Sequence, residues 1–149
     1  METIKGFLEG TRFFKEFTSE EKDVLVQIQN IYLKFNAGEI IIQEGEVDQA
    51  LYIVLSGQVV VNKKGLEGLI ISYLGPGSIF GEISLIRKHP RTTNVVADGE
   101  VVVMKIDKKM IDQLDPRLQK KFQDQLIQVL IERLAEMNQK YINAMFFNL

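Results

Sequence analysis

The chain contains no cysteine, and it has a single histidine, His89. Without cysteine it cannot form disulfides, thiolate metal sites, cysteine-ligated iron–sulfur clusters or a cysteine nucleophile. A metal-binding β-barrel needs several histidines and carboxylates in one cluster, and one histidine argues against that class. A serine hydrolase needs only one histidine, but no nucleophile-elbow sequence is present. We therefore expect no metal, no catalytic residues and no enzymatic activity.

Long apolar runs and a strong excess of one charge are also missing. The main charge-free run, Leu69–Gly81, is too short to span a bilayer and is broken by Gly-Pro-Gly. The start of the chain shows no basic-then-apolar signal segment. A net charge of -2 offers no electrostatic basis for nucleic acid as the main partner. We expect a cytoplasmic protein without a membrane span and without direct nucleic-acid binding.

The composition is that of one ordinary globular domain. The chain has 149 residues, of which 46% are hydrophobic and 26% are charged. This length is enough for a substantial core. We expect a single domain over 1–149, with helices in 1–30, a β region in 31–107 and helices in 108–149.

The N-terminal thirty residues have the features of helices. The segment TSEEKDVLVQIQ places Thr18 or Ser19 as a helix N-cap, with acidic residues in the first turn and apolar residues behind them. We expect a helix to begin there.

Residues 31–106 have the texture of an antiparallel β structure. Short β-branched runs alternate with glycine-containing turns, and no helix-length spacer separates them. The runs are IYLKF, EIIIQ, LYIVL, QVVVNK, LIISYL, NVVA and VVVMKI. This spacing predicts a sandwich or barrel and argues against a parallel sheet with crossover helices.

The last forty residues predict two helices. A short one ends near Pro116, and a long one of about thirty residues follows without Gly or Pro. The long helix carries an apolar stripe at 3–4 residue spacing, typical of a helix pair. Its members are Ile127, Leu130, Leu134, Met137, Tyr141 and Ala144. The stripe indicates a homodimer seam or, as the alternative, one broad face directed at the core of the same chain.

The segment GSIFGEISLIRKHPRTTNVV, 77–96, places an acid, Glu82, directly after a glycine and an arginine, Arg91, directly after a proline. Gly77 and Gly81 permit positive φ or close backbone approach. A helix start at Glu82 would present free N–H groups to an anion. Arg91 can donate two parallel hydrogen bonds to phosphate oxygens, whereas Glu82 suits a hydroxyl donor. The pattern favours a ligand with both a phosphate and a sugar hydroxyl, and an exposed Glu–Arg pair is the structural alternative.

This segment resembles the phosphate-binding cassette of the cyclic nucleotide-binding domain, as in sensor domains of the catabolite activator protein type. The cassette reads Phe-Gly-Glu, a small or apolar residue, Ala or Ser, Leu, a short loop and then Pro-Arg. The matching residues are Phe80, Gly81, Glu82, Ile83, Ser84, Leu85, Pro90 and Arg91. Upstream, Gly38, Gly45 and Gly57 match the family's turn glycines. The resemblance implies an antiparallel β-roll of the jelly-roll type, flanked by N-terminal helices and a long C-terminal helix.

The resemblance also implies roles for residues of the cassette, 80–93. Arg91 would hold the cyclic phosphate, and Glu82 would accept the ribose 2′-hydroxyl. Backbone or hydroxyl contacts would come from Gly81, Ile83 and Ser84. Thr92 occupies the position that touches phosphate and base, and it is compatible with either cAMP or cGMP. Thr93 departs from the usual alanine and would narrow the pocket or add a contact.

The family's final helix usually caps the base, which points here to the stretch around Arg133, Met137 and Asn138. The resemblance implies a cAMP or cGMP sensor that signals by moving this helix. We expect no DNA-reading domain, so its output would pass to an effector protein or to the dimer. The apolar residues Met145, Phe146, Phe147 and Leu149 suit such an interface. Two alternatives are a nucleotide-free interaction scaffold and an unrelated β-roll binding protein or enzyme.

Overall fold

The computed structural model describes residues 3–63, 70–82 and 88–146. The chain divides into two compact units, Met1–Gln113 and Leu114–Leu149. That the two form one domain stays a prediction.

The first unit opens with helices, as the sequence indicates. They are α1 (Ile4–Gly10), the 3-10 turn η1 (Arg12–Phe14) and α2 (Ser19–Val26). The hydroxyl of Thr18 accepts a hydrogen bond from the Glu21 N–H at 3.1 Å, and the Glu21 carboxylate accepts one from the Thr18 N–H at 2.8 Å. This reciprocal capping confirms Thr18 as the N-cap and explains why α2 begins at Ser19.

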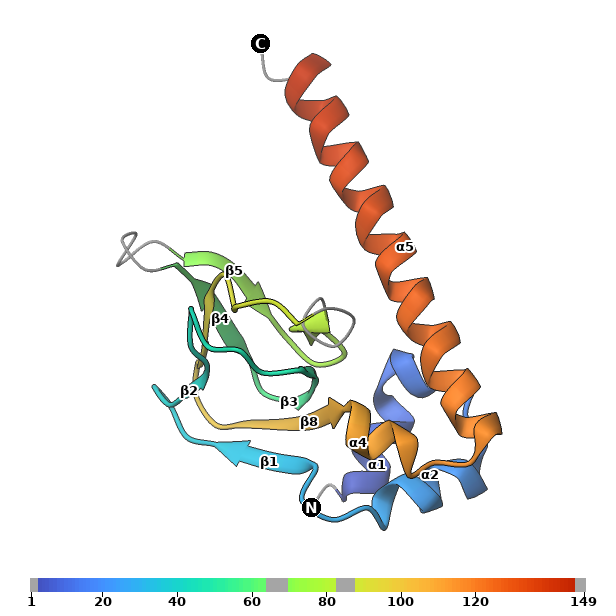
Figure 1. The fold of residues 1–149 in the computed structure, drawn as a ribbon. Helices are drawn as coiled ribbons and strands as arrows, with labels where there is room; N and C mark the ends of the chain where they lie inside the picture. The colour runs from blue at the N-terminus through green and yellow to red at the C-terminus, as the bar shows by residue number, and fades with distance from the viewer. Residues whose placement is uncertain (1–2, 64–69, 83–87, 147–149) are drawn as a thin grey trace. The chain divides into compact units, whose positions relative to one another are not determined.

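Two four-stranded antiparallel sheets follow these helices in the first unit (Figure 1). One sheet has the order β1-β8-β3-β6 and the other β2-β7-β4-β5. The strands are β1 (Tyr32–Phe35), β2 (Ile40–Ile42), β3 (Ala50–Ser56), β4 (Val59–Asn62), β5 (Ile70–Leu74), β6 (Ile79–Phe80), β7 (Asn94–Ala97) and β8 (Val101–Asp107). The predicted antiparallel β-roll with flanking helices is confirmed. Only β6, two residues long, was not among the predicted runs.

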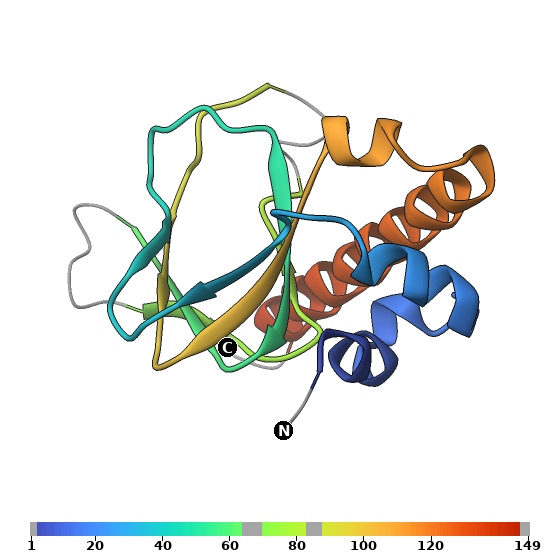
Figure 2. The ribbon, with the colours of Figure 1, turned by 90° about the horizontal axis from the view of Figure 1, so that it is seen from below.

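The core lies between the sheets and continues on the outer face of β3. Alternate β3 residues, among them Tyr52 and Val54, join the cluster that Val59 and Val103 line from other strands. The intervening Leu51 and Ile53 are also fully buried, and α1 packs against this strand. Figure 2 shows the N-terminal helices on one side of the strands. A strand covered on both faces needs an unbroken apolar run, which the segment LYIVL supplies.

The turn at Gly57 shows why glycine punctuates these strands. Its φ is +86°, and an added Cβ would lie 2.2 Å from the carbonyl oxygen of Glu100. A side chain is therefore excluded there both by conformation and by space.

The predicted C-terminal helices are present, with one refinement. Helix α4 (Lys108–Asp112) is capped by Asp107, whose carboxylate accepts from the Met110 N–H at 2.8 Å. Helix α5 spans Pro116–Phe146, and Asp115 accepts from the Leu118 N–H at 3.0 Å. Pro116 thus opens the second helix, where its missing N–H costs nothing. No helix in the described residues has the length and apolar character needed to cross a bilayer.

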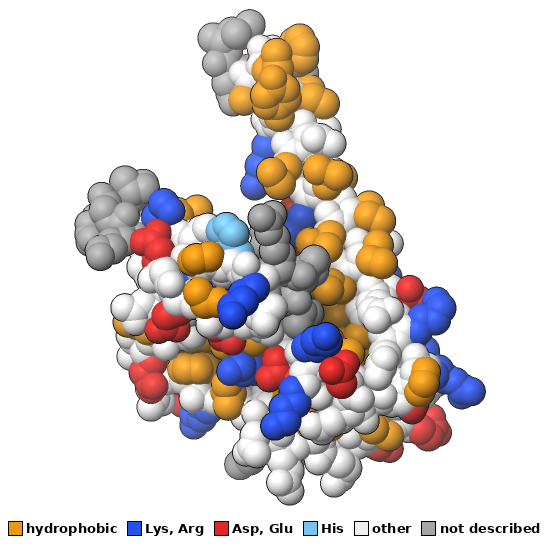
Figure 3. Space-filling view, viewed as in Figure 1, with side chains coloured by type: hydrophobic (Ala, Val, Ile, Leu, Met, Phe, Trp, Pro, Cys, Tyr) orange, Lys and Arg blue, Asp and Glu red, His pale blue; other side chains and the backbone are white. Residues whose placement is uncertain are grey.

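Helix α5 has an apolar face along much of its length. Ile127, Leu134, Met137 and Tyr141 are each more than half exposed. Orange side chains follow α5 up to its end in Figure 3. Away from this face, polar residues bond at i,i+4 spacing, with Gln128 donating to Glu132 and Gln139 to Asn143. These bonds lie on the side of α5 opposite the apolar stripe.

Candidate functional site

Arg91 is a buried arginine in the segment that leads into β7, with only 6% of its surface exposed. Its backbone pairs with the loop that follows β2. The Arg91 N–H donates to the Glu46 carbonyl at 2.8 Å, and the Gly45 N–H donates to the Arg91 carbonyl at 2.8 Å. These two bonds fix the point from which the side chain enters the β-roll.

The guanidinium group of Arg91 is bonded mainly to backbone carbonyls. Nη2 donates to the Ala50 oxygen at 2.6 Å, and Nη1 donates to the Gly81 oxygen at 3.0 Å. Asp48 lies at the edge of this arrangement, with Oδ2 3.5 Å from Nη2. The carbonyls orient the positive charge but do not neutralise it, and the carboxylate is at the outer limit of a hydrogen bond.

The remaining nitrogen, Nε, is buried and has no hydrogen-bond partner among the described residues. Leaving a buried donor of a charged group unpaired is costly, so an orphan of this kind calls for an explanation. An anion with two acceptor oxygens would satisfy Nε and compensate the charge. The side chain therefore has the properties of an anion receptor.

Because Gly81 has no side chain, its backbone can lie close to the guanidinium of Arg91. Its φ is +79°, and an added Cβ would lie 2.7 Å from Nη1 of Arg91 and 3.1 Å from the Ala50 oxygen. Glu82 follows with a helical backbone and is only 9% exposed. Because both Glu82 and Arg91 are buried, the alternative of an exposed Glu–Arg pair is wrong. Ile83 and Ser84 lie outside the described residues.

Asp48 and Tyr52 are site residues that the sequence did not single out. The Tyr52 hydroxyl donates to Oδ2 of Asp48 at 3.2 Å, and its ring stacks on Phe80 at 5.2 Å with 9° between the planes. Burial, reinforced by the nearby Asp48 carboxylate, raises the pKa of Tyr52, so the hydroxyl stays protonated and keeps donating. Phe80 directly precedes Gly81, and this stack therefore links the start of the motif to the acid beside Arg91.

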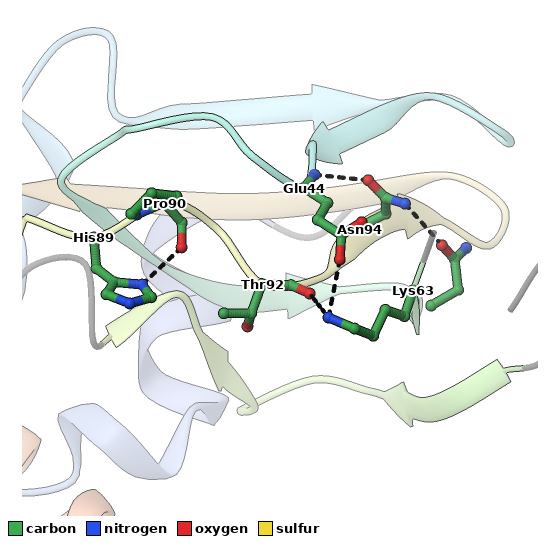
Figure 4. Close-up of polar contacts among 7 residues, drawn as sticks. Glu44, Lys63, His89, Pro90, Thr92 and Asn94 are labelled. Atoms are coloured by element: carbon green, nitrogen blue, oxygen red, sulfur yellow. Dashed lines mark hydrogen bonds and ion pairs between the residues drawn. The ribbon is translucent and has the colours of Figure 1, made fainter. Parts of the chain in front are cut away.

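Thr92 and Thr93 follow Arg91, with Thr92 exposed and Thr93 half-buried. The Thr92 carbonyl accepts a hydrogen bond from Nζ of Lys63 at 2.9 Å (Figure 4). His89 is exposed, and its Nδ1 donates to the Pro90 carbonyl at 2.8 Å. Arg133 and Met137 belong to the second unit, and their predicted contact with a base stays a prediction.

Metal chemistry has no support in the described part of the chain. No group of three or more His, Cys, Asp or Glu side chains there is arranged to hold a metal ion. The site offers the guanidinium of Arg91, the buried carboxylate of Glu82 and the glycine, Gly81, that follows β6.

Comparison with known proteins decides the family. The model of the cyclic nucleotide-binding domain matches residues 32–115, more than half of the chain. The chain belongs to the cyclic nucleotide-binding domain family. The matched range contains all eight described strands and both Glu82 and Arg91.

Relatives of the domain occur in proteins of different kinds. The cGMP-dependent protein kinase of Toxoplasma gondii is 31% identical over 115 residues, covering 77% of this chain and 11% of the kinase. The CRP-like cAMP-activated global transcriptional regulator of Mycobacterium tuberculosis is 28% identical over 114 residues, covering 75% and 50%. The chain thus spans about a tenth of the kinase and half of the regulator.

The fold is similar to that of a solved regulator. The crystal structure of the Thermus thermophilus catabolite activator protein matches with a TM-score of 0.74 and 28% identity, covering 90% of this chain and 63% of that chain. Both the strand arrangement and the family model therefore point to the same class of ligand-binding domain.

Proposed function

We propose that the chain is a regulatory module that binds a cyclic purine nucleotide, with the phosphate on Arg91 and the ribose 2′-hydroxyl on Glu82. The observation that carries this proposal is the buried guanidinium whose Nε lacks a partner among the described residues. The relatives' names include both cGMP and cAMP, and so the proposal stops at the sugar-phosphate, which the two nucleotides share. Gly81, Ile83, Ser84, Thr92 and Thr93 would complete the pocket, and the chain would carry out no catalysis.

The two charges divide the recognition of the ligand. A guanidinium matches phosphate oxygens in both geometry and charge, and burial strengthens the interaction because water competes less. The Glu82 carboxylate accepts hydrogen bonds only and would repel a phosphate. The residue types thus favour the phosphate at Arg91 and the hydroxyl at Glu82.

Replacing Arg91 tests the phosphate end. We expect Arg91→Leu to weaken binding of cAMP or cGMP roughly 10–100-fold, from the loss of a charged hydrogen bond of about 1.5–3 kcal/mol. Arg91→Lys keeps the positive charge but loses the forked guanidinium. Its nucleotide affinity should therefore lie between those of the wild type and Arg91→Leu. Titration of fluorescent cyclic nucleotides gives the affinities, and 5′-AMP serves as the control ligand.

The wild-type titration also separates the sensor from a nucleotide-free scaffold. Saturable binding of cAMP or cGMP supports the sensor. Absence of binding of both at high micromolar concentration rejects it in favour of the scaffold. Arg91→Leu affinity equal to that of the wild type would show that the phosphate lies elsewhere.

Replacing Glu82 tests the ribose end with a matched ligand. We expect Glu82→Gln to weaken binding about tenfold, since a neutral acceptor makes a weaker bond than a carboxylate. The same substitution should change binding of the 2′-deoxy nucleotide by less than ~2-fold, because the hydroxyl is then missing. An equal loss for both nucleotides would contradict a contact between Glu82 and the 2′-hydroxyl.

For the output, we propose that nucleotide binding shifts the position of α5. This helix forms a compact unit of its own, so it can move without unpairing the strands. The nucleotide can drive such a shift only through different affinities for the two positions. Spin labels at Lys34 and Gln139 report it, and an unchanged distance distribution at saturating nucleotide would exclude it. An effector protein would then bind the helix in its new position. In the nucleotide-bound state, Arg133 or Met137 would cover the base.

We also propose that α5 forms a homodimer through the stripe of Ile127, Leu130, Leu134, Met137 and Tyr141. Its support is the apolar face opposite the polar bonds of Gln128 and Gln139. Leu134→Lys should dissociate the dimer, because a charge at the seam is desolvated on pairing. Gln139→Lys on the polar face is the control and should leave the dimer intact. Sedimentation equilibrium measures both, and a monomeric wild type at micromolar concentration would refute the dimer.

A further inference from the structure

Lys63 contacts residues that flank two neighbouring strands beside the proposed phosphate site. Its Nζ lies 3.0 Å from Oε1 of Glu44 and 2.9 Å from the Thr92 carbonyl oxygen (Figure 4). Lys63 directly follows β4, and Glu44 comes just after β2. Because β7 lies between β2 and β4 in the sheet, the lysine reaches over the segment that leads into β7.

The Asn94 side chain, two residues after Thr92, forms a second set of bonds near Lys63 and Glu44. The Glu44 N–H donates to Oδ1 of Asn94 at 2.7 Å, and Nδ2 of Asn94 donates to Oδ1 of Asn62 at 3.2 Å. A backbone N–H can only donate, so it fixes which atom of the Asn94 amide faces Glu44 and which faces Asn62. The entry to β7 is thus bonded to Lys63 at Thr92, and at Asn94 it is bonded both to Asn62 of β4 and to Glu44, just after β2.

These bonds bear on Arg91 through its backbone. The two residues after Glu44, Gly45 and Glu46, make both of the Arg91 backbone hydrogen bonds. Lys63 therefore connects the residue before this pairing loop to the residue after Arg91. The guanidinium itself adds its bonds to Ala50 and Gly81 from the other side. A shift of the pairing loop would move the base of the arginine side chain relative to these carbonyls.

We propose that Lys63, with Glu44, is a positioning residue for the anion site and acts by holding the Arg91–Thr92 backbone in place. The inference rests on the proposed function, since it concerns the same ligand. Lys63 is bonded to protein acceptors and does not itself serve as the phosphate ligand. The side chains of Lys63 and Glu44 are 46% and 20% exposed, and so the effect is modest.

The test compares four variants by nucleotide titration, with thermal melting to confirm folding. Lys63→Met should weaken binding ~3–10-fold, since a partly exposed charged interaction is lost. Lys63→Arg should restore most of the affinity, because its fork can donate to both acceptors. Lys34→Met is the matched control: Lys34 lies on β1, has the same charge and pairs with Glu100 at 3.3 Å, and this variant should bind like the wild type.

Glu44→Gln separates positioning from a direct charge effect, because the two predict opposite changes in nucleotide affinity. If Lys63 acted only through its positive charge on the anion, removing the Glu44 carboxylate would strengthen binding. Positioning through the ion pair predicts the opposite, a loss of ~2–5-fold. Tighter binding by Glu44→Gln, or Lys63→Met affinity equal to that of Lys34→Met, would overturn the inference. Both outcomes leave the proposed function intact, whereas it fails if the wild type binds no nucleotide.

Discussion

The structure around the proposed site depends on one interaction, the buried guanidinium of Arg91 bonded to the carbonyls of Ala50 and Gly81. Ala50 begins β3, and Gly81 follows β6 directly. The arginine thus joins the central strand of one sheet, the glycine motif and the segment that enters β7 of the other sheet. The contact requires glycine at position 81, because any side chain there would collide with Nη1 of Arg91.

A buried cation held by neutral carbonyls is a costly arrangement for stability alone. The carbonyls compensate part of the lost hydration, and the carboxylate of Asp48 is half-buried and 3.5 Å away. Replacing such a group by an apolar residue would often leave a fold equally stable. A pre-oriented, incompletely paired guanidinium makes sense as a receptor, because a ligand then gains a fixed partner without the cost of ordering it.

The sequence predicted most of the fold, and it singled out two charged residues, Glu82 and Arg91, that the structure buries. Helix capping by Thr18 and the strands between glycines are local signals, visible within a few neighbouring residues. Glu82 and Arg91, both buried, could be singled out together because both lie in one motif. The motif did not place Asp48 and Lys63, since these meet Arg91 and Thr92 across 43 and 29 residues of sequence. It also did not place Tyr52 and Glu44, which bond to Asp48 and Lys63. Strand β6 was missed because two residues carry no periodicity.

The most direct test of the account follows the Nε–H group of Arg91 by ¹H–¹⁵N NMR, with Arg91→Lys to assign its resonance. In the nucleotide-free protein this proton has no acceptor among the described residues. The account predicts a marked downfield shift of the proton as cyclic nucleotide saturates the site, because Nε then donates to a phosphate oxygen. An unchanged resonance at saturating nucleotide would show that Arg91 does not bind the phosphate.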